Sequence, residues 1–383
     1  MIEITDKSKC CGCEACAQKC PKQCIILKED EDGFRYPYVD KKKCIDCHLC
    51  EKTCPVINQF EEKYPIDILA CKNKNERIRL ESSSGGLFFS IASRIIQNKG
   101  IVYGVKYDKD WNIVFSSAET TEGIKEFQGS KYAQAYVGET YANVERDLKN
   151  EKPVLFVGAS CQVAALKRYL RKNYDNLFTI DFICHGVPSQ ALYKRFLYEE
   201  VLKKGYVITK INMRDKTKGW REYRFVIEGY KTTKTSRHIL LYKPFVDTTY
   251  GKLFLSDVVL RPSCHSCCAK SGRSDSDLTL ADFWGVWNTH PDKNDNRGLT
   301  LAIINKERGK KLLDFESIDY FRPSFEEAFA TNGGYFKSTY ASPKRENVIS
   351  DLRNGHSLKY VKDKFFPISP YVQIKKFIKE IIK

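Results

Sequence analysis

Two copies of one cysteine pattern stand near the start of the chain: CCGCEACAQKCP at residues 10–21 and CIDCHLCEKTCP at residues 44–55. Each copy spaces its cysteines as C-x2-C-x2-C-x3-C and ends in proline. In ferredoxin-type runs three thiolates wrap one cubane, and the fourth, at the start of a short helix, ligates the other cluster. Zinc sites and disulfides rarely repeat such a run, so the pattern predicts two 4Fe–4S clusters.

The same spacing predicts which cysteines share a cluster, since the last cysteine of each run belongs to the other run's cluster. One cluster is expected on Cys10, Cys13, Cys16 and Cys54, and the second on Cys44, Cys47, Cys50 and Cys20. Cys11 and Cys24 fall outside the pattern and are interpreted as spare thiols. Residues 25–39 are expected to form short strands, with the clusters acting as the core of this small unit.

The composition is that of a globular protein with redox or metal chemistry. Of 383 residues, 42% are hydrophobic and 29% are charged, which excludes a disordered or collagen-like chain. The sequence has no secretion signal and no apolar run near the roughly 18 residues of a membrane span, so we expect a cytoplasmic protein. Sixteen cysteines in a reducing compartment indicate metal sites rather than disulfides.

The net charge is strongly positive, because 64 Lys and Arg outnumber 48 Asp and Glu (64 − 48 = +16). Nucleic-acid binding is not expected, since the lysines are spread along the chain and each cluster with four thiolates contributes about −2. A redox partner protein, such as a reduced ferredoxin, or an anionic cofactor accounts for the surplus equally well.

After a charged linker at residues 61–65, the pattern becomes that of an α/β domain. Strands are expected at residues 68–72, 101–107, 113–117, 154–157, 177–183, 278–283 and 299–304, with β-type alternation over 207–245. Helices are expected at 87–98, at 162–171, after Ser189, and as a basic amphipathic tail at 371–383. The alternation of strands and helices predicts a parallel core sheet with ligands at the carboxyl ends of its strands.

Four core cysteines are candidates for a third cluster. Cys264 and Cys267 form one CxxC pair, which cannot complete a site alone. Cys161 and Cys184 each follow a predicted core strand and could supply the missing ligands. Three alternatives remain: a nucleophilic Cys161 at a helix N-terminus, zinc bound with a nearby histidine, and buried structural thiols. The cluster is favoured because the ferredoxin unit needs an electron acceptor nearby.

The stretch SSSGG at residues 82–86 precedes a predicted helix and is a candidate phosphate-binding loop, although such residues also form ordinary N-caps. Lys131 could add a positive charge at the same ligand, or it could be a solvated surface lysine. Linking one-electron clusters to two-electron chemistry usually takes a flavin. No GxGxxG turn is present, so the flavin is not expected in a Rossmann site.

Six motifs occur in order: SGG at 84–86, GSKY at 129–132, GASCQ at 158–162, CHGVP at 184–188, C-x2-C at 264–267 and SDLTLADFWG at 276–285. With the ferredoxin runs, they resemble the deazaflavin (F420) coenzyme hydrogenase/dehydrogenase beta-subunit family over residues 5–315. The resemblance implies an FAD-binding reductase core with its own cluster on Cys161, Cys184, Cys264 and Cys267. It also implies that the flavin is lined by Ser84, Gly85, Gly86, Ser130 and Lys131. Relatives reduce a deazaflavin coenzyme or other conjugated substrates.

Together these patterns predict an α+β and α/β protein: a two-cluster ferredoxin domain (1–60), a flavin- and iron–sulfur-binding reductase core (66–320) and a C-terminal helical extension (321–383). We expect an oxidoreductase that passes electrons between ferredoxin-type clusters and FAD to reduce or oxidise an organic substrate or a deazaflavin-type coenzyme. The alternative is a non-catalytic electron-transfer subunit of a larger redox complex. The sequence does not identify a catalytic residue.

Overall fold

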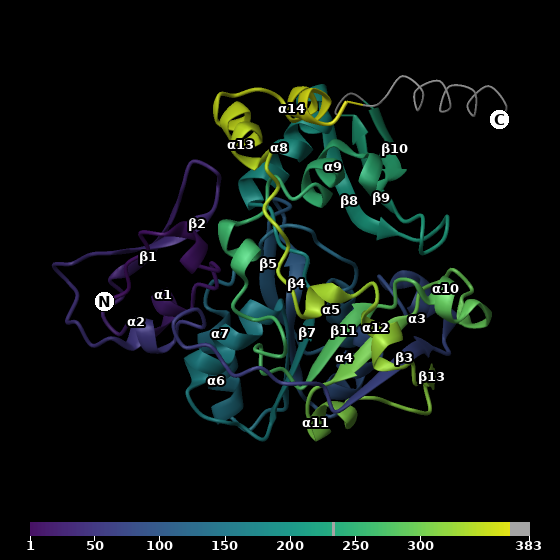
Figure 1. The fold of residues 1–383 in the computed structure, drawn as a ribbon, viewed down its shortest axis with the longest axis horizontal. Helices are drawn as coiled ribbons and strands as arrows, with labels where there is room; N and C mark the ends of the chain where they lie inside the picture. Colours follow the sequence, from purple (N-terminus) through teal and green to yellow (C-terminus); the bar gives the residue numbers. More distant parts are fainter. Residues whose placement is uncertain (232–233, 368–383) are drawn as a thin grey trace.

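The computed structural model describes residues 1–231 and 234–367 and centres on an eight-stranded sheet (Figure 1). Its order is β13-β3-β12-β11-β7-β6-β4-β5. The bounds are β3 Asp67–Asn73, β4 Ile101–Tyr107, β5 Ile113–Ala118, β6 Val154–Val157, β7 Leu177–Phe182, β11 Leu278–Asp282, β12 Thr300–Ile304 and β13 Ile318–Phe321.

The expected parallel core is confirmed for β4, β6, β7 and β11. The sheet as a whole is mixed, because β5, β12, β3 and β13 pair antiparallel with their neighbours. The link from β4 to β5 spans only residues 108–112, which is too short for the crossover that a parallel pair requires.

Helices cover both faces of the sheet. Val102 and Leu155 pack with Leu87, Ile91 and other residues of α4 (Leu87–Gln97) on one face. Their strand neighbours Tyr103 and Phe156 point the other way, toward α6 (Thr140–Lys149) and α7 (Ser160–Leu170). Burial on both faces explains why these strands read as continuous apolar runs.

A second, three-stranded antiparallel sheet lies beside the main one, in the order β10-β9-β8 (Figure 1). Its strands are β8 Tyr206–Asp215, β9 Arg224–Lys231 and β10 Lys234–Pro244. The remaining helices are α3 Glu76–Glu81, α5 Thr121–Lys125, α8 Gln190–Glu200, α9 Thr249–Leu255, α10 Val286–Thr289, α11 Glu307–Lys310, α12 Phe325–Phe329, α13 Arg345–Arg353 and α14 Leu358–Phe365. The predicted tail helix at 371–383 lies outside the described residues.

The ferredoxin unit carries the hairpin of β1 (Ile25–Glu29) and β2 (Arg35–Val39) and two short helices, α1 (Ala15–Lys19) and α2 (Leu49–Lys52). The third cysteine of each run lies in a helix. Cys20 follows the end of α1, which corrects the expectation that the fourth cysteine begins a helix. The unit packs against α6 and α7 of the core.

Two further features bear on the site. Helix α7 begins at Ser160, two residues before the predicted start, so Cys161 lies in its first turn. Within the described parts of the chain, no helix is long and apolar enough to cross a bilayer.

Candidate functional site

The structure brings Cys20 of the first run to three cysteines of the second. A small cavity is lined by Cys20, Cys44, Cys47 and Cys50. These are the four cysteines expected to share a cluster, and Cys47 is exposed. We call them the outer cluster site.

The other four cysteines form a more buried group, the inner cluster site, made of Cys10, Cys13, Cys16 and Cys54. Cys13, Cys16 and Cys54 are each only 8% exposed. Burial raises the pKa of the Cys16 thiol, and the neighbouring Cys10 and Cys54 raise that pKa further. Thiols packed this closely favour a cationic centre that would neutralise them, so the residues fit a cluster.

The two cysteines outside the spacing pattern lie beside predicted ligands. Cys24 Sγ is 3.3 Å from Cys20 Sγ and lines the outer cavity. Hydrogen bonds from Cys13, Cys161 and Cys268 lower the pKa of Cys11. Interpreting them as spare thiols therefore missed their position, because spacing along the chain does not indicate which loop a neighbouring thiol will meet.

A large cavity, the core cavity, lies at the carboxyl ends of the parallel strands and has a volume of about 560 Å³. It collects the segments that the sequence singled out. Its lining includes Ser82–Ser84, Gly86, Gln128–Lys131, Gly158–Cys161, Cys184, Cys264, Cys267 and Cys268. Gly85, the remaining candidate, is absent from the lining.

The core thiols come from three separate segments. Burial, and to a smaller extent the nearby Cys184, raise the pKa of Cys264 to about 12. A hydrogen bond with Cys11, followed by burial, raises the pKa of Cys161 well above its usual value, and Cys267 and Cys268 add to this effect. A raised pKa opposes a thiolate nucleophile at Cys161.

The two histidines near these thiols have other partners. His185 lines the cavity, and its Nε2 lies 2.6 Å from Asp257 Oδ1. His265 Nδ1 lies 2.9 Å from the Thr339 carbonyl oxygen. Within residues 1–231 and 234–367, no group of three or more His, Cys, Asp or Glu side chains is placed to hold a single metal ion.

Hydrogen bonds attach part of the loop before α4 to the sheet. The Gly85 N–H donates to Thr300 Oγ1 at 2.8 Å. A Cβ on Gly85 would lie 2.4 Å from the Cys71 carbonyl oxygen, so glycine is required there for close packing. The Ser84 hydroxyl donates to the Leu299 carbonyl at 2.9 Å. Ser83 and Ser130 join the two predicted flavin segments through hydroxyls 3.0 Å apart.

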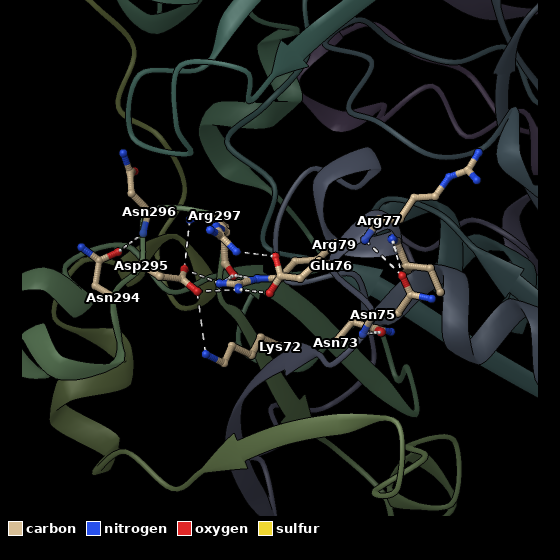
Figure 2. Close-up of polar contacts among 12 residues, drawn as sticks. Lys72, Asn73, Asn75, Glu76, Arg77, Arg79, Asn294, Asp295, Asn296 and Arg297 are labelled. Carbon is tan, nitrogen blue, oxygen red and sulfur yellow. Dashed lines mark hydrogen bonds and ion pairs between the residues drawn. The ribbon is translucent and has the colours of Figure 1, made fainter.

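Two buried cations, Arg79 and Lys216, lie next to the same loop. Figure 2 shows Arg79 facing Asp295, and its two guanidinium nitrogens donate to that carboxylate at 2.6 and 2.5 Å. Arg79 Nε also donates to the Gly298 carbonyl at 3.0 Å. Lys216 Nζ donates to the carbonyls of Arg79, Ser84 and Arg297 at 2.7, 2.8 and 2.7 Å. Sequence patterns do not predict these contacts between distant segments.

Lys131 is the basic group of the GSKY segment. Its Nζ donates to the Gln128 carbonyl at 3.0 Å and lies 5.4 Å from the Tyr107 ring centre. Burial lowers the pKa of Lys131 to about 7. The neighbouring Gly129 has φ +79°, and a Cβ there would meet no atom within 4 Å, so space remains beside this segment for a ligand.

Another part of the cavity lining combines two aromatic rings with an arginine that the sequence analysis did not single out. Arg214 donates to Asp282 at 2.5 Å, with its guanidinium carbon 4.6 Å from the Tyr223 ring centre and 5.4 Å from that of Trp284. Asp282 and Trp284 belong to the SDLTLADFWG motif, whereas Arg214 comes from β8.

Two segments of the chain match known protein families. Residues 9–58 match the family described as "4Fe-4S dicluster domain". Residues 151–320 match the family that describes the C terminus of the beta subunit of coenzyme F420 hydrogenase/dehydrogenase. A chain of the F420-reducing [NiFe] hydrogenase complex from Methanosarcina barkeri is similar, with 15% identity and a TM-score of 0.45, over 79% of this chain and 92% of that chain. No curated protein matches.

These matches define the class as iron–sulfur electron-transfer proteins of the oxidoreductase type. The resemblance stated from the sequence is confirmed: residues 151–320 match the family of the C terminus of the coenzyme F420 hydrogenase/dehydrogenase beta subunit, and a 4Fe–4S dicluster domain precedes them in the chain.

Proposed function

We propose that the protein is an iron–sulfur flavoprotein oxidoreductase that exchanges electrons between its ferredoxin unit and an organic substrate or deazaflavin-type coenzyme. One observation carries the proposal: a single cavity brings together the serine–glycine loop, Lys131 and the core thiols. Bound clusters would supply one-electron transfer, and FAD would couple it to two-electron chemistry.

The residues of the cavity divide into holding and positioning roles. Cys161, Cys184, Cys264 and Cys267 are the proposed ligands of a third cluster. Ser84, Gly86 and Ser130 would contact the flavin, while Gly85 keeps their loop against β12. Lys131 would place a positive charge near an anionic group of the flavin.

The lining of the cavity supports a planar substrate. Its volume of about 560 Å³ lies within the roughly 300–1,000 Å³ of an ordinary ligand site. Tyr223 and Trp284 offer aromatic faces, and the Arg214 guanidinium, paired with Asp282, lies close to both rings. This combination suits a conjugated molecule.

Lys131 makes the flavin proposal testable through pH. Its pKa of about 7 lies well below the usual lysine value, so the side chain of the flavin-free protein loses its proton above that pH. An anion bound nearby would raise this pKa, and binding would then take up a proton. FAD affinity is therefore expected to be full below about pH 7 and to fall up to tenfold per pH unit above it.

The measurement is an FAD titration of flavin-depleted protein, followed by tryptophan fluorescence between pH 6 and 9. Lys131→Met should weaken binding at pH 6 about tenfold and remove most of the pH dependence. Lys125→Met is the matched control, because Lys125 pairs with Glu122 at 2.6 Å in exposed α5. Absence of FAD binding by the wild type would contradict the proposal. An unchanged pH profile in Lys131→Met would contradict the role of Lys131.

A further inference from the structure

Arg261 is a buried cation at the junction of the ferredoxin unit and the core. It directly precedes the short helical turn Pro262–Ser266, which carries Cys264, and its side chain is only 1% exposed. Among the described residues it makes no ion pair with a carboxylate. The neighbouring carboxylate of Glu14 pairs instead with Arg35 at 3.1 Å.

The guanidinium reaches across to the first cysteine run. Its Nε donates to the Cys10 carbonyl at 2.7 Å, and its Nη2 donates to the Arg35 carbonyl at 3.0 Å. The same Nη2 donates to Cys10 Sγ at 3.5 Å, and Nη1 donates to Gln134 Oε1 at 3.0 Å. The thiol sulfur is the one partner among these that becomes an anion when it ligates iron.

A glycine gives the first cysteine run room for this contact, and the second run has no glycine at the corresponding position. Gly12 has φ +67°, and a Cβ there would lie 2.3 Å from Gln134 Nε2 and 2.8 Å from the guanidinium carbon of Arg261, so glycine is required for both side chains to approach. Asp46 occupies the corresponding position in the second run, where the outer cluster site faces solvent. Arg261 therefore distinguishes the two predicted clusters.

A charge buried without an ion-pair partner is costly, because desolvation is not offset. A cluster with four thiolates carries a net negative charge, which would compensate Arg261. Reduction adds one more negative charge, so a fixed cation and a donor to a ligand sulfur both favour the reduced form.

We propose that Arg261 raises the reduction potential of the cluster at the inner cluster site and so sets the energy at which electrons pass between the ferredoxin unit and the core. This inference rests on the cluster assignment of the proposed function. Arg261 is a positioning and potential-setting residue, since it reaches the cluster only through Cys10.

The test is a redox titration of the anaerobic full-length protein followed by electron paramagnetic resonance, with iron measured on each sample. Cys47→Ser assigns the signal of the outer cluster. Arg261→Gln should lower the midpoint potential of the inner cluster and leave that of the outer cluster unchanged. Arg261→Lys retains the charge and should shift it less.

Arg168→Gln is the matched control, because Arg168 also pins the ferredoxin unit but donates to the carbonyls of Asn58 and Gln59, at 2.7 and 2.9 Å. It should shift neither potential. An unchanged inner potential in iron-replete Arg261→Gln would overturn the inference, as would equal shifts in the Gln and Lys variants. If Arg261→Gln loses the inner cluster, retention of the cluster near wild-type potential in Arg261→Lys supports the inference, and loss in both overturns it. Flavin content of the wild type is a separate readout that tests the proposed function alone.

Discussion

Replacing Cys20 and Cys24 together by serine is expected to remove the cluster bound by the second cysteine run and to leave the first run's cluster intact. Cys20 lines the outer cavity with Cys44, Cys47 and Cys50, although it belongs to the first run. Cys24 must be replaced as well, because its sulfur lies 3.3 Å from that of Cys20 and could take its place as a ligand. Iron should fall by about four atoms per chain, the content of one cubane.

The remaining signal identifies which cluster was lost. Cys24→Ser alone is the control and should keep its full iron content, since Cys20 remains. Cys47→Ser should affect the same signal as the double variant, because both residues line one cavity. Loss of the inner cluster instead would mean that each run binds its own cluster, which would contradict the crossed ligation.

Replacing Arg79 by methionine is expected to lower the free energy of unfolding by about 1.5–3 kcal/mol, the range for losing hydrogen bonds to a charged group, because Asp295 itself is 37% exposed to solvent. Arg79 is 1% exposed and holds Asp295 through two nitrogens, as Figure 2 shows. Its loss also removes the donors to the Gly298 carbonyl. Urea unfolding followed by tryptophan fluorescence measures the change.

Arg77→Met provides the comparison within the same helix, α3. The Arg77 side chain is 83% exposed and pairs with Glu81 at 3.0 Å, so the expected loss is about 1 kcal/mol or less. Similar losses in both variants would contradict the role assigned to the Arg79–Asp295 pair. We also expect Arg79→Met to retain less flavin, because the Arg79 side chain holds the Gly298 carbonyl and Gly298 packs directly against Ser84 in the loop before α4.

Local patterns predicted much of this fold. β4 and β6 match their expected bounds, and α4 ends one residue before its expected end, because apolar periodicity and flanking glycines are encoded nearby in the chain. The mixed sheet was not predicted, since local patterns do not indicate whether strands such as β12 and β3 pair parallel or antiparallel with their neighbours. The start of α7 was placed at residue 162 instead of 160, because Ser160 and Cys161 continue the turn after β6.

The candidate site was also predicted only in part, namely where its residues belong to local motifs. Cys161, Cys184, Cys264 and Cys267 carry local motifs, and they line one cavity as expected. Arg214 and Arg261 carry no local signal, because each acts on segments far away in the sequence. Cys11 and Cys268 also line the cavity. Cys11 was interpreted as a spare thiol and Cys268 was given no role, because the spacing pattern assigns ligands only to their neighbours Cys10 and Cys267.

The central claim is that one chain carries a ferredoxin unit and a flavin-binding core with its own cluster. Iron, acid-labile sulfide and flavin measured together on anaerobically purified protein test this claim most directly. The account predicts about 12 Fe and 12 sulfide per chain, for three cubanes, together with one FAD released on denaturation. About 8 Fe with zinc at the core cysteines, or denatured protein that releases no yellow chromophore, would contradict it.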